Sequence, residues 1–146
     1  IAFGALILNN FVNVAGLPNA IVAFIQSLDI APLTVILVIL LIYILLGTII
    51  EGLAMIFLTV PIFVPVVDAM GFDLIWFGIV MVMVVEISLI TPPIGLNVFV
   101  IKSMLPDVPL SAIFKGIVPF FAADIVRLLL VVFLPGLALW LPRVLS

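Results

Sequence analysis

Hydrophobic residues form long runs along this chain, separated by short interruptions rich in Pro, Gly and polar residues. The interruptions fall near residues 16–18, 29–32, 47–52, 68–73, 91–97 and 106–109. A helix that crosses the roughly 30 Å hydrocarbon core of a bilayer needs about 20 mainly apolar residues. The pattern therefore predicts an all-α integral membrane protein whose helices end at these interruptions.

Residues 1–146 are expected to form one part of a larger membrane domain. The first residue is Ile, and Ile1–Phe11 has the composition of a helix already under way, so we expect the C-terminal part of a longer protein. The interruptions divide this part into a helix with an interfacial arm (1–31), a helical hairpin (32–70), a broken helix (74–105) and C-terminal helices (109–146).

The run Leu74–Leu105 contains the strongest local signal in the sequence. As one helix it would be roughly 45 Å long, too long for a single ordinary span. Pro92 and Pro93 remove two helical N–H donors, and Gly95 adds a permissive backbone. In lipid, opened backbone is tolerated only where it faces protein or a water-filled cavity. The run therefore predicts a broken membrane helix whose opened segment, Thr91–Asn97, lines a site for an ion or a polar solute.

Two shorter apolar runs, Leu33–Leu46 and Leu53–Val67, flank the polar segment Gly47–Gly52. The first run would reach only about 21 Å as a helix, which is less than the thickness of the hydrocarbon core. We therefore expect a re-entrant helical hairpin with its tip near the middle of the membrane. Two ordinary tilted spans joined by a short polar turn are the alternative.

Composition argues against several other classes of function. The chain is 68% hydrophobic and 8% charged, with a net charge of −3, whereas soluble domains are about 25% charged. The acidic balance argues against a nucleic-acid partner. The sequence contains no Cys and no His, which excludes disulfides, thiolate metal sites and the commonest general base. We therefore expect a protein that moves a solute, not an enzyme, and no cofactor beyond a coupling ion.

Four ionisable residues interrupt the apolar runs, and a charge at the bilayer centre costs about 2.5–3.5 kcal/mol, so each is a candidate functional residue. Asp124 and Arg127 are three residues apart and are expected to pair; a role in binding an anionic substrate is the alternative. Glu86 is expected either to sense a coupling ion or to pair with a base elsewhere in the longer protein. Glu51 is expected to attract a cation at the hairpin tip, or else to sit favourably at a helix N-terminus.

The opened segment also offers oxygen ligands. The Thr91 hydroxyl, the Asn97 amide and carbonyls freed at the break suit Na⁺, which discontinuous membrane helices bind in this manner. The N-terminus of the second half-helix, near Gly95, presents partial positive charge to a substrate carboxylate. If the tip at Gly47–Gly52 meets this segment, the two form half of a transporter site of the inverted-repeat kind.

Four motifs in sequence order resemble the C-terminal repeat of the large membrane (permease) subunit of tripartite ATP-independent periplasmic (TRAP) transporters. They are Gly47–Ala54, Val60–Pro65, Met70–Asp73 and Thr91–Asn97, and the resemblance covers nearly the whole chain. It implies an elevator-type secondary transporter that couples Na⁺ to the movement of an organic acid, such as a C4-dicarboxylate or sialic acid. It also implies a multi-pass protein of the bacterial inner membrane that works with a small membrane subunit and a periplasmic substrate-binding protein.

By the same resemblance, the hairpin tip and the unwound loop would hold Na⁺ and substrate together. The residues of this shared site would be Gly47, Thr48, Glu51, Thr91, Pro92, Pro93, Gly95 and Asn97. The Na⁺ ligands would come from Gly47, Thr48, Thr91, Gly95 and Asn97. The family's N-terminal repeat, with its own hairpin and Pro-Pro loop, lies outside this sequence, so this chain alone is not expected to transport.

Two other classes of function remain open on the sequence alone. One is a stand-alone carrier of the same ion-transporter superfamily, which would need no binding protein. The other is a non-transporting membrane scaffold or an ion-channel subunit. A channel would line its pore along a whole helix face, whereas the polar residues of this chain cluster at two interruptions.

Overall fold

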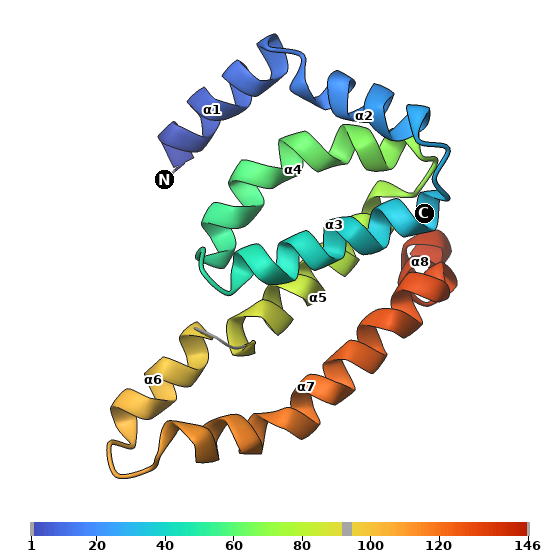
Figure 1. Cartoon of the computed structure of the whole chain (residues 1–146). Coiled ribbons are helices and arrows are strands. Elements are labelled where there is room, and N and C mark those ends of the chain that lie inside the picture. Colours follow the sequence, from blue (N-terminus) through green and yellow to red (C-terminus); the bar gives the residue numbers. More distant parts are fainter. Residues whose placement is uncertain (1, 92–94, 146) are drawn as a thin grey trace.

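A computed structural model describes residues 2–91 and 95–145, and all the regular structure in these residues is helical (Figure 1). The expectation of an all-α protein is therefore confirmed. The helices are α1 (Ala2–Val14), α2 (Leu17–Ser27), α3 (Pro32–Gly47), α4 (Gly52–Ala69), α5 (Leu74–Ile90), α6 (Leu96–Met104), α7 (Leu110–Phe133) and α8 (Pro135–Leu145).

Helices α1 and α2 form a bent pair that lies along α4 (Figure 1). The two helices are bent by 55° at the break between them. Gly16 precedes α2 with a φ of 70°, a left-handed conformation that glycine adopts without a steric penalty. Pro18 lies in the first turn of α2, where a missing N–H leaves no helical hydrogen bond unmade.

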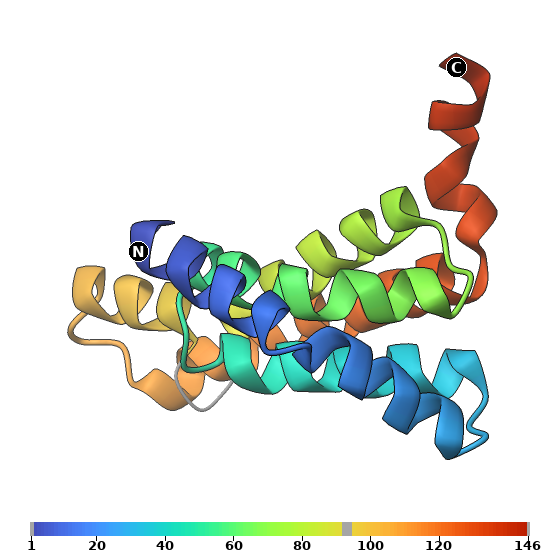
Figure 2. The ribbon, with the colours of Figure 1, turned by 90° about the horizontal axis from the view of Figure 1, so that it is seen from above.

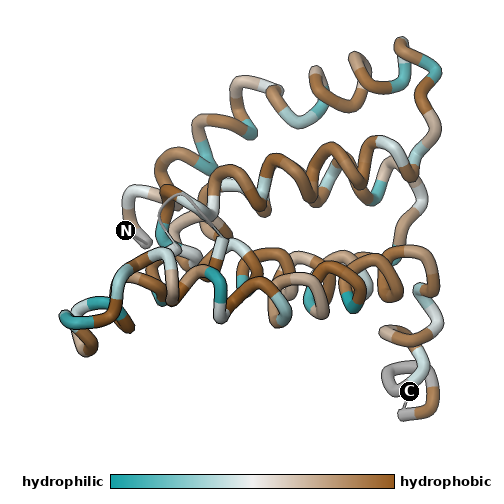
Figure 3. The backbone as a smooth tube through the Cα atoms, turned by 60° about the horizontal axis from the view of Figure 1, so that its bottom comes forward, coloured by the Kyte–Doolittle hydropathy of each residue, from teal (hydrophilic) through white to brown (hydrophobic). Residues whose placement is uncertain are grey.

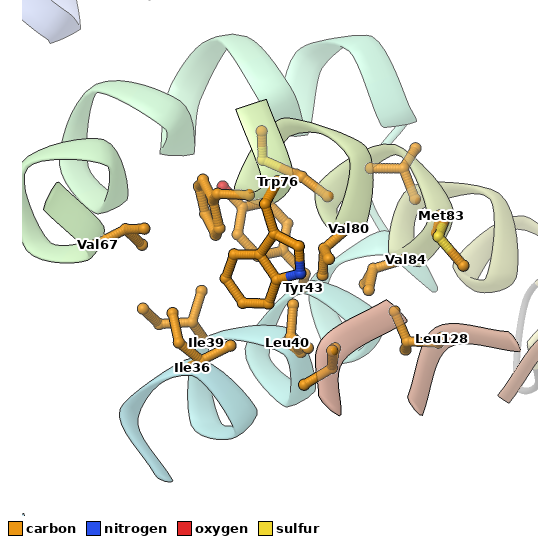
Figure 4. Close-up of a cluster of buried hydrophobic side chains, with 14 of the residues drawn as sticks. Ile36, Ile39, Leu40, Tyr43, Val67, Trp76, Val80, Met83, Val84 and Leu128 are labelled. Atoms are coloured by element: carbon orange, nitrogen blue, oxygen red, sulfur yellow. The ribbon is translucent and has the colours of Figure 1, made fainter. Parts of the chain in front are cut away.

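The core lies between α3, α4, α5 and the second half of α7. Trp76 of α5 and Tyr43 of α3 are among its largest fully buried side chains, and they lie among aliphatic side chains from α3, α5 and α7 (Figure 4). The Trp76 indole N–H also donates to the carbonyl oxygen of Val131 at 2.8 Å, which joins α5 to α7. Because lipid is as apolar as these side chains, close packing and such hydrogen bonds hold membrane helices together.

Two of the described helices, α4 and α7, are long and apolar enough to cross a membrane, and the bent α1–α2 pair adds a third if it counts as one span. Helices α3 and α5 are apolar but shorter, with 16 and 17 residues. Figure 3 shows hydrophobic colour along most of the tube, with short hydrophilic stretches both at the connections and within helices. Helix α8 leaves the end of α7 at a steep angle (Figure 2), and its Leu139 is buried in the core.

The helix ends lie at or within a few residues of the interruptions, and the acidic loop is one place where they differ from the expectation. Asp68 was expected in the loop 68–73, but it lies in the last turn of α4, which continues to Ala69. The connection to α5 is shorter than expected because Gly71 takes a φ of 80° and turns the chain tightly. Asp73 then caps α5, its carboxylate accepting from the N–H groups of Ile75 and Trp76.

Candidate functional site

The turn between α3 and α4 forms the tip of a helical hairpin. Thr48 follows the last residue of α3 and is buried, and its hydroxyl donates to the carbonyl oxygen of Leu45 at 2.7 Å. Glu51 precedes α4, and its carboxylate accepts from the N–H groups of Leu53 at 2.9 Å and Ala54 at 3.0 Å. Glu51 is therefore the N-cap of α4, in agreement with the predicted position at a helix N-terminus. The residue is otherwise exposed.

The hairpin tip lies directly against the last turns of α5. An alanine Cβ at Gly47 would overlap the side chain of Ser88, and one at Gly52 would lie 2.8 Å from Cγ1 of Val85. The two glycines therefore bring the backbone of the tip closer to α5 than any other residue would allow. Small residues serve the same purpose at many contacts between membrane helices.

The end of α5 is held by hydrogen bonds that centre on Thr91. Its hydroxyl donates to the carbonyl oxygen of Ile87 at 2.7 Å, and its N–H donates to the carbonyl oxygen of Ser88 at 3.2 Å. Thr91 itself has extended backbone angles, so α5 stops there. Ser88 is fully buried and its hydroxyl donates to the carbonyl oxygen of Val85. Ser88 thus contacts the hairpin tip with its side chain and Thr91 with its carbonyl oxygen.

On the far side of the break, Gly95 starts α6 with a φ of 53° and a ψ of 80°. The position of a Cβ at Gly95 would be 3.3 Å from the Thr91 carbonyl oxygen, so the two ends of the break lie close together. Pro92 and Pro93, which the sequence also placed in the site, lie outside the described residues. Asn97 was expected in the unwound loop, but it lies in the first turn of α6 with its side chain exposed, because the helix resumes at Leu96.

The structure thus brings together the hairpin tip and the last turn of α5, which carries Thr91. The sequence analysis did not include Ser88 among the candidate site residues. The available signal was a small polar residue three positions before Thr91 in an apolar helix. Helix α6 adds the partial positive charge of its N-terminus next to the break.

A separate polar cluster joins α5 to α7. Arg127 and Asp124 of α7 form the expected local ion pair, with 3.2 Å between Nη2 and Oδ1. The same Nη2 lies 3.4 Å from Oε2 of Glu86 on α5. Glu86 therefore contacts a base of this chain, a pairing that the sequence analysis did not predict. That pairing depends on helix packing, because the two residues lie 41 positions apart.

The sequence matches one family of known proteins over most of its length. Residues 1–137 match the family described as the tripartite ATP-independent periplasmic transporter, DctM component. The chain is 35% identical over 127 residues to the C4-dicarboxylate TRAP transporter large permease protein of Pseudomonas aeruginosa, covering 87% of this chain and 30% of the relative. It is 34% identical over 127 residues to the sialic acid TRAP transporter large permease protein of Vibrio cholerae, with the same two coverages.

A third relative is the isethionate TRAP transporter permease protein of Oleidesulfovibrio alaskensis, which is 29% identical over 136 residues. That match covers 93% of this chain and 21% of the relative. The chain therefore spans about a third or less of the length of these curated relatives, all of which are named as transporter permeases and not as enzymes.

Proposed function

The chain belongs to the DctM component family of tripartite ATP-independent periplasmic transporters, and from that premise we propose that it forms half of the Na⁺ and substrate site of an organic-anion carrier. The complete protein would use a Na⁺ gradient to move the anion across the bacterial inner membrane. A small membrane subunit and a periplasmic binding protein would be its partners. The remaining half of the site would come from an inverted repeat, and the site would move by an elevator mechanism.

The contact of Gly47 with Ser88 is the observation that carries this proposal. It places the polar hairpin tip against the turn of α5 that ends at Thr91, so two interruptions from separate apolar runs lie side by side. An isolated Pro kink would need no such partner. A carrier site needs this juxtaposition, because neither segment alone offers enough ligands to replace the hydration shell of an ion.

Oxygen atoms supply the proposed Na⁺ ligands. The Thr48 and Thr91 hydroxyls donate their protons to main-chain carbonyls, so their oxygen lone pairs stay available to a cation. Carbonyl oxygens at Gly47 and at the break around Thr91 and Gly95 would complete the set, as in other discontinuous membrane helices. Glu51 would contribute through its charge at the tip, since its carboxylate already accepts two N–H groups of α4.

The proposed substrate is an organic anion. The three relatives are named for C4-dicarboxylate, sialic acid and isethionate transport, and each of these solutes carries a carboxylate or a sulfonate. The exposed Asn97 side chain in the first turn of α6 can donate to such an oxygen. The dipole of α6 adds partial positive charge at the same end.

Uptake by the full-length permease with its partner subunits in proteoliposomes tests this function. We expect uptake of a labelled organic acid to require both Na⁺ and the binding protein. Thr91→Ala should raise the Na⁺ concentration for half-maximal uptake by about tenfold, the equivalent of about 1.4 kcal/mol in ligand binding. Asn97→Ala should instead raise the half-saturating substrate concentration.

Matched controls are available on helices away from the site. Thr34→Ala at the start of α3 and Asn19→Ala on α2 remove the same groups from exposed positions, and both variants should transport normally. Uptake that ignores the Na⁺ gradient would contradict the coupling. Uptake that needs no binding protein would instead favour a stand-alone carrier, and equal effects of site and control variants would remove Thr91 and Asn97 from the site.

A further inference from the structure

The polar cluster between α5 and α7 does not balance its own charge. Glu86 and Asp124 both contact the single guanidinium of Arg127, and both do so through the same nitrogen, Nη2. Two carboxylates therefore face one cation. The side chains of Arg127, Glu86 and Asp124 are 51%, 60% and 30% exposed on the surface of the described chain.

The cluster lies deep in the expected membrane. Helix α5 begins after the polar loop that ends at Asp73, and Glu86 lies about 20 Å along the helix from there at 1.5 Å per residue. Asp124 lies about 21 Å along α7 from its start at Leu110. Both distances pass the middle of a hydrocarbon core about 30 Å thick. Exposed charge at that depth is unfavourable unless it meets protein or water.

The lysines of this chain cannot supply the missing cation. The Lys102 ammonium donates to the carbonyl oxygens of Pro106 and Val108, both at 2.7 Å, at the far end of α6. Lys115 is on α7 itself, but it lies about 18 Å from Arg127 along the helix axis. Among the bases whose side chains the structure describes, only Arg127 reaches the two carboxylates.

We propose that this exposed face of α5 and α7 docks a transmembrane helix of the same permease subunit that carries a lysine or an arginine against Glu86 and Asp124. The charge of the cluster specifies a basic residue. We assign the basic helix to the same subunit because about 70% of the length of the curated relatives lies outside the segment that matches this chain. A basic side chain there neutralises the second carboxylate and covers the exposed guanidinium edge. The proposal needs α5 and α7 to lie in the membrane, and it does not depend on Na⁺ coupling.

Site-specific photo-crosslinking in the full-length permease with its partner subunits, in lipid nanodiscs, tests the docking. A benzophenone amino acid replaces Val82, which is 52% exposed and lies one turn before Glu86 on the same face of α5. The matched control carries the probe at Val118, which is 61% exposed and about half a turn around α7 from Arg127. Both replaced side chains are exposed and neither belongs to the charged cluster.

The expected result is a crosslinked peptide from a membrane helix of the same subunit that contains Lys or Arg, obtained from Val82 and not from Val118. Changing that base to Gln should lower the crosslink yield, and exchanging the charges, Glu86→Lys with the base changed to Glu, should restore it. Crosslinks only to lipid, to a helix without a base, to the small subunit or to a second copy would each overturn the proposal. Loss of Na⁺-dependent uptake with the crosslink intact would count against the transport function alone.

Discussion

Gly47 of α3 and Ser88 of α5 touch so closely that no methyl group fits between them. The contact lies where the hairpin tip meets the end of the first half of the broken helix. Ser88 also accepts the N–H of Thr91 with its carbonyl oxygen. Ser88 therefore contacts both the hairpin tip and Thr91, which belong to the two segments that the proposed site needs. A change in the size of the side chains at this contact should displace both segments.

We expect Gly47→Ala to separate the hairpin tip from α5. Its Cβ would overlap Ser88 and lie 3.3 Å from Cε of Met55, and overpacking of this kind costs about 1–3 kcal/mol. The second-site change Ser88→Gly removes the overlapping atoms and should restore most of the loss. Thermal unfolding of the full-length protein in detergent, with uptake measured in parallel, checks both variants.

The control for this steric argument is Gly78→Ala, which is also in an apolar helix. A Cβ at Gly78 would have no atom within 4 Å apart from the backbone of its own helix and its chain neighbours. The variant should be neutral, or stabilising by up to about 1 kcal/mol, because alanine favours the helix. A Gly47→Ala variant as stable as the control, or one that Ser88→Gly fails to rescue, would show that the tip can shift without loss.

Gly95→Ala tests the backbone at the start of α6. The φ of 53° is left-handed, and a Cβ there would lie 3.1 Å from Cγ2 of Val98 and 3.3 Å from the Thr91 carbonyl oxygen. The conformation alone costs about 1–2 kcal/mol for a residue with a Cβ. We expect a lower unfolding temperature and weaker uptake. Gly116→Ala, at a helical site with open space, serves as the comparison, and equal behaviour of the two variants would contradict the geometry.

A hydrogen bond between the hydroxyls of Tyr43 and Thr59 joins α3 to α4, the two helices of the hairpin. The two oxygens lie 2.5 Å apart. The Thr59 hydroxyl donates its one proton to the carbonyl oxygen of Met55 at 2.7 Å, so it accepts from the Tyr43 hydroxyl. Tyr43→Phe should cost about 0.5–1.5 kcal/mol, the usual net value of one hydrogen bond. In a double-mutant cycle, Thr59→Val should add little once Tyr43 is Phe. Fully additive losses would show that the two hydroxyls do not stabilise each other.

Lys102 holds the connection between α6 and α7 closed through the carbonyl oxygens of Pro106 and Val108. Lys102→Met keeps the aliphatic stem and removes the donor. We expect faster hydrogen exchange at the Val108 amide, which donates to Leu105 at 3.1 Å within this loop. Lys115→Met removes an exposed lysine of α7 and should leave that amide unchanged. If the Val108 amide exchanges as slowly in Lys102→Met as in the wild type, the loop is stable without the lysine.

Some features of the site could be predicted from the sequence because they depend on local backbone chemistry. Pro92 and Pro93 remove helical donors wherever they stand, and Gly95 permits a left-handed turn, so the break in the run 74–105 follows from the residues alone. The extent of the loop was harder to place. Asn97 belongs to α6 because the helix resumes at Leu96, as soon as the backbone angles permit. In an apolar run, no residue type marks the point at which a helix resumes.

The sequence by itself determined that the chain is a set of apolar helices, where they are interrupted, and that Asp124 and Arg127 pair, because proline geometry, glycine freedom and helical spacing act over a few residues. Only the tertiary structure decided that Ser88 lies under Gly47 and that Arg127 reaches Glu86. Helices that are apolar on every side carry no periodic signal of which face meets a neighbour. In lipid the choice of face depends on the fit of small residues and buried polar groups, and that fit exists only once the helices are packed.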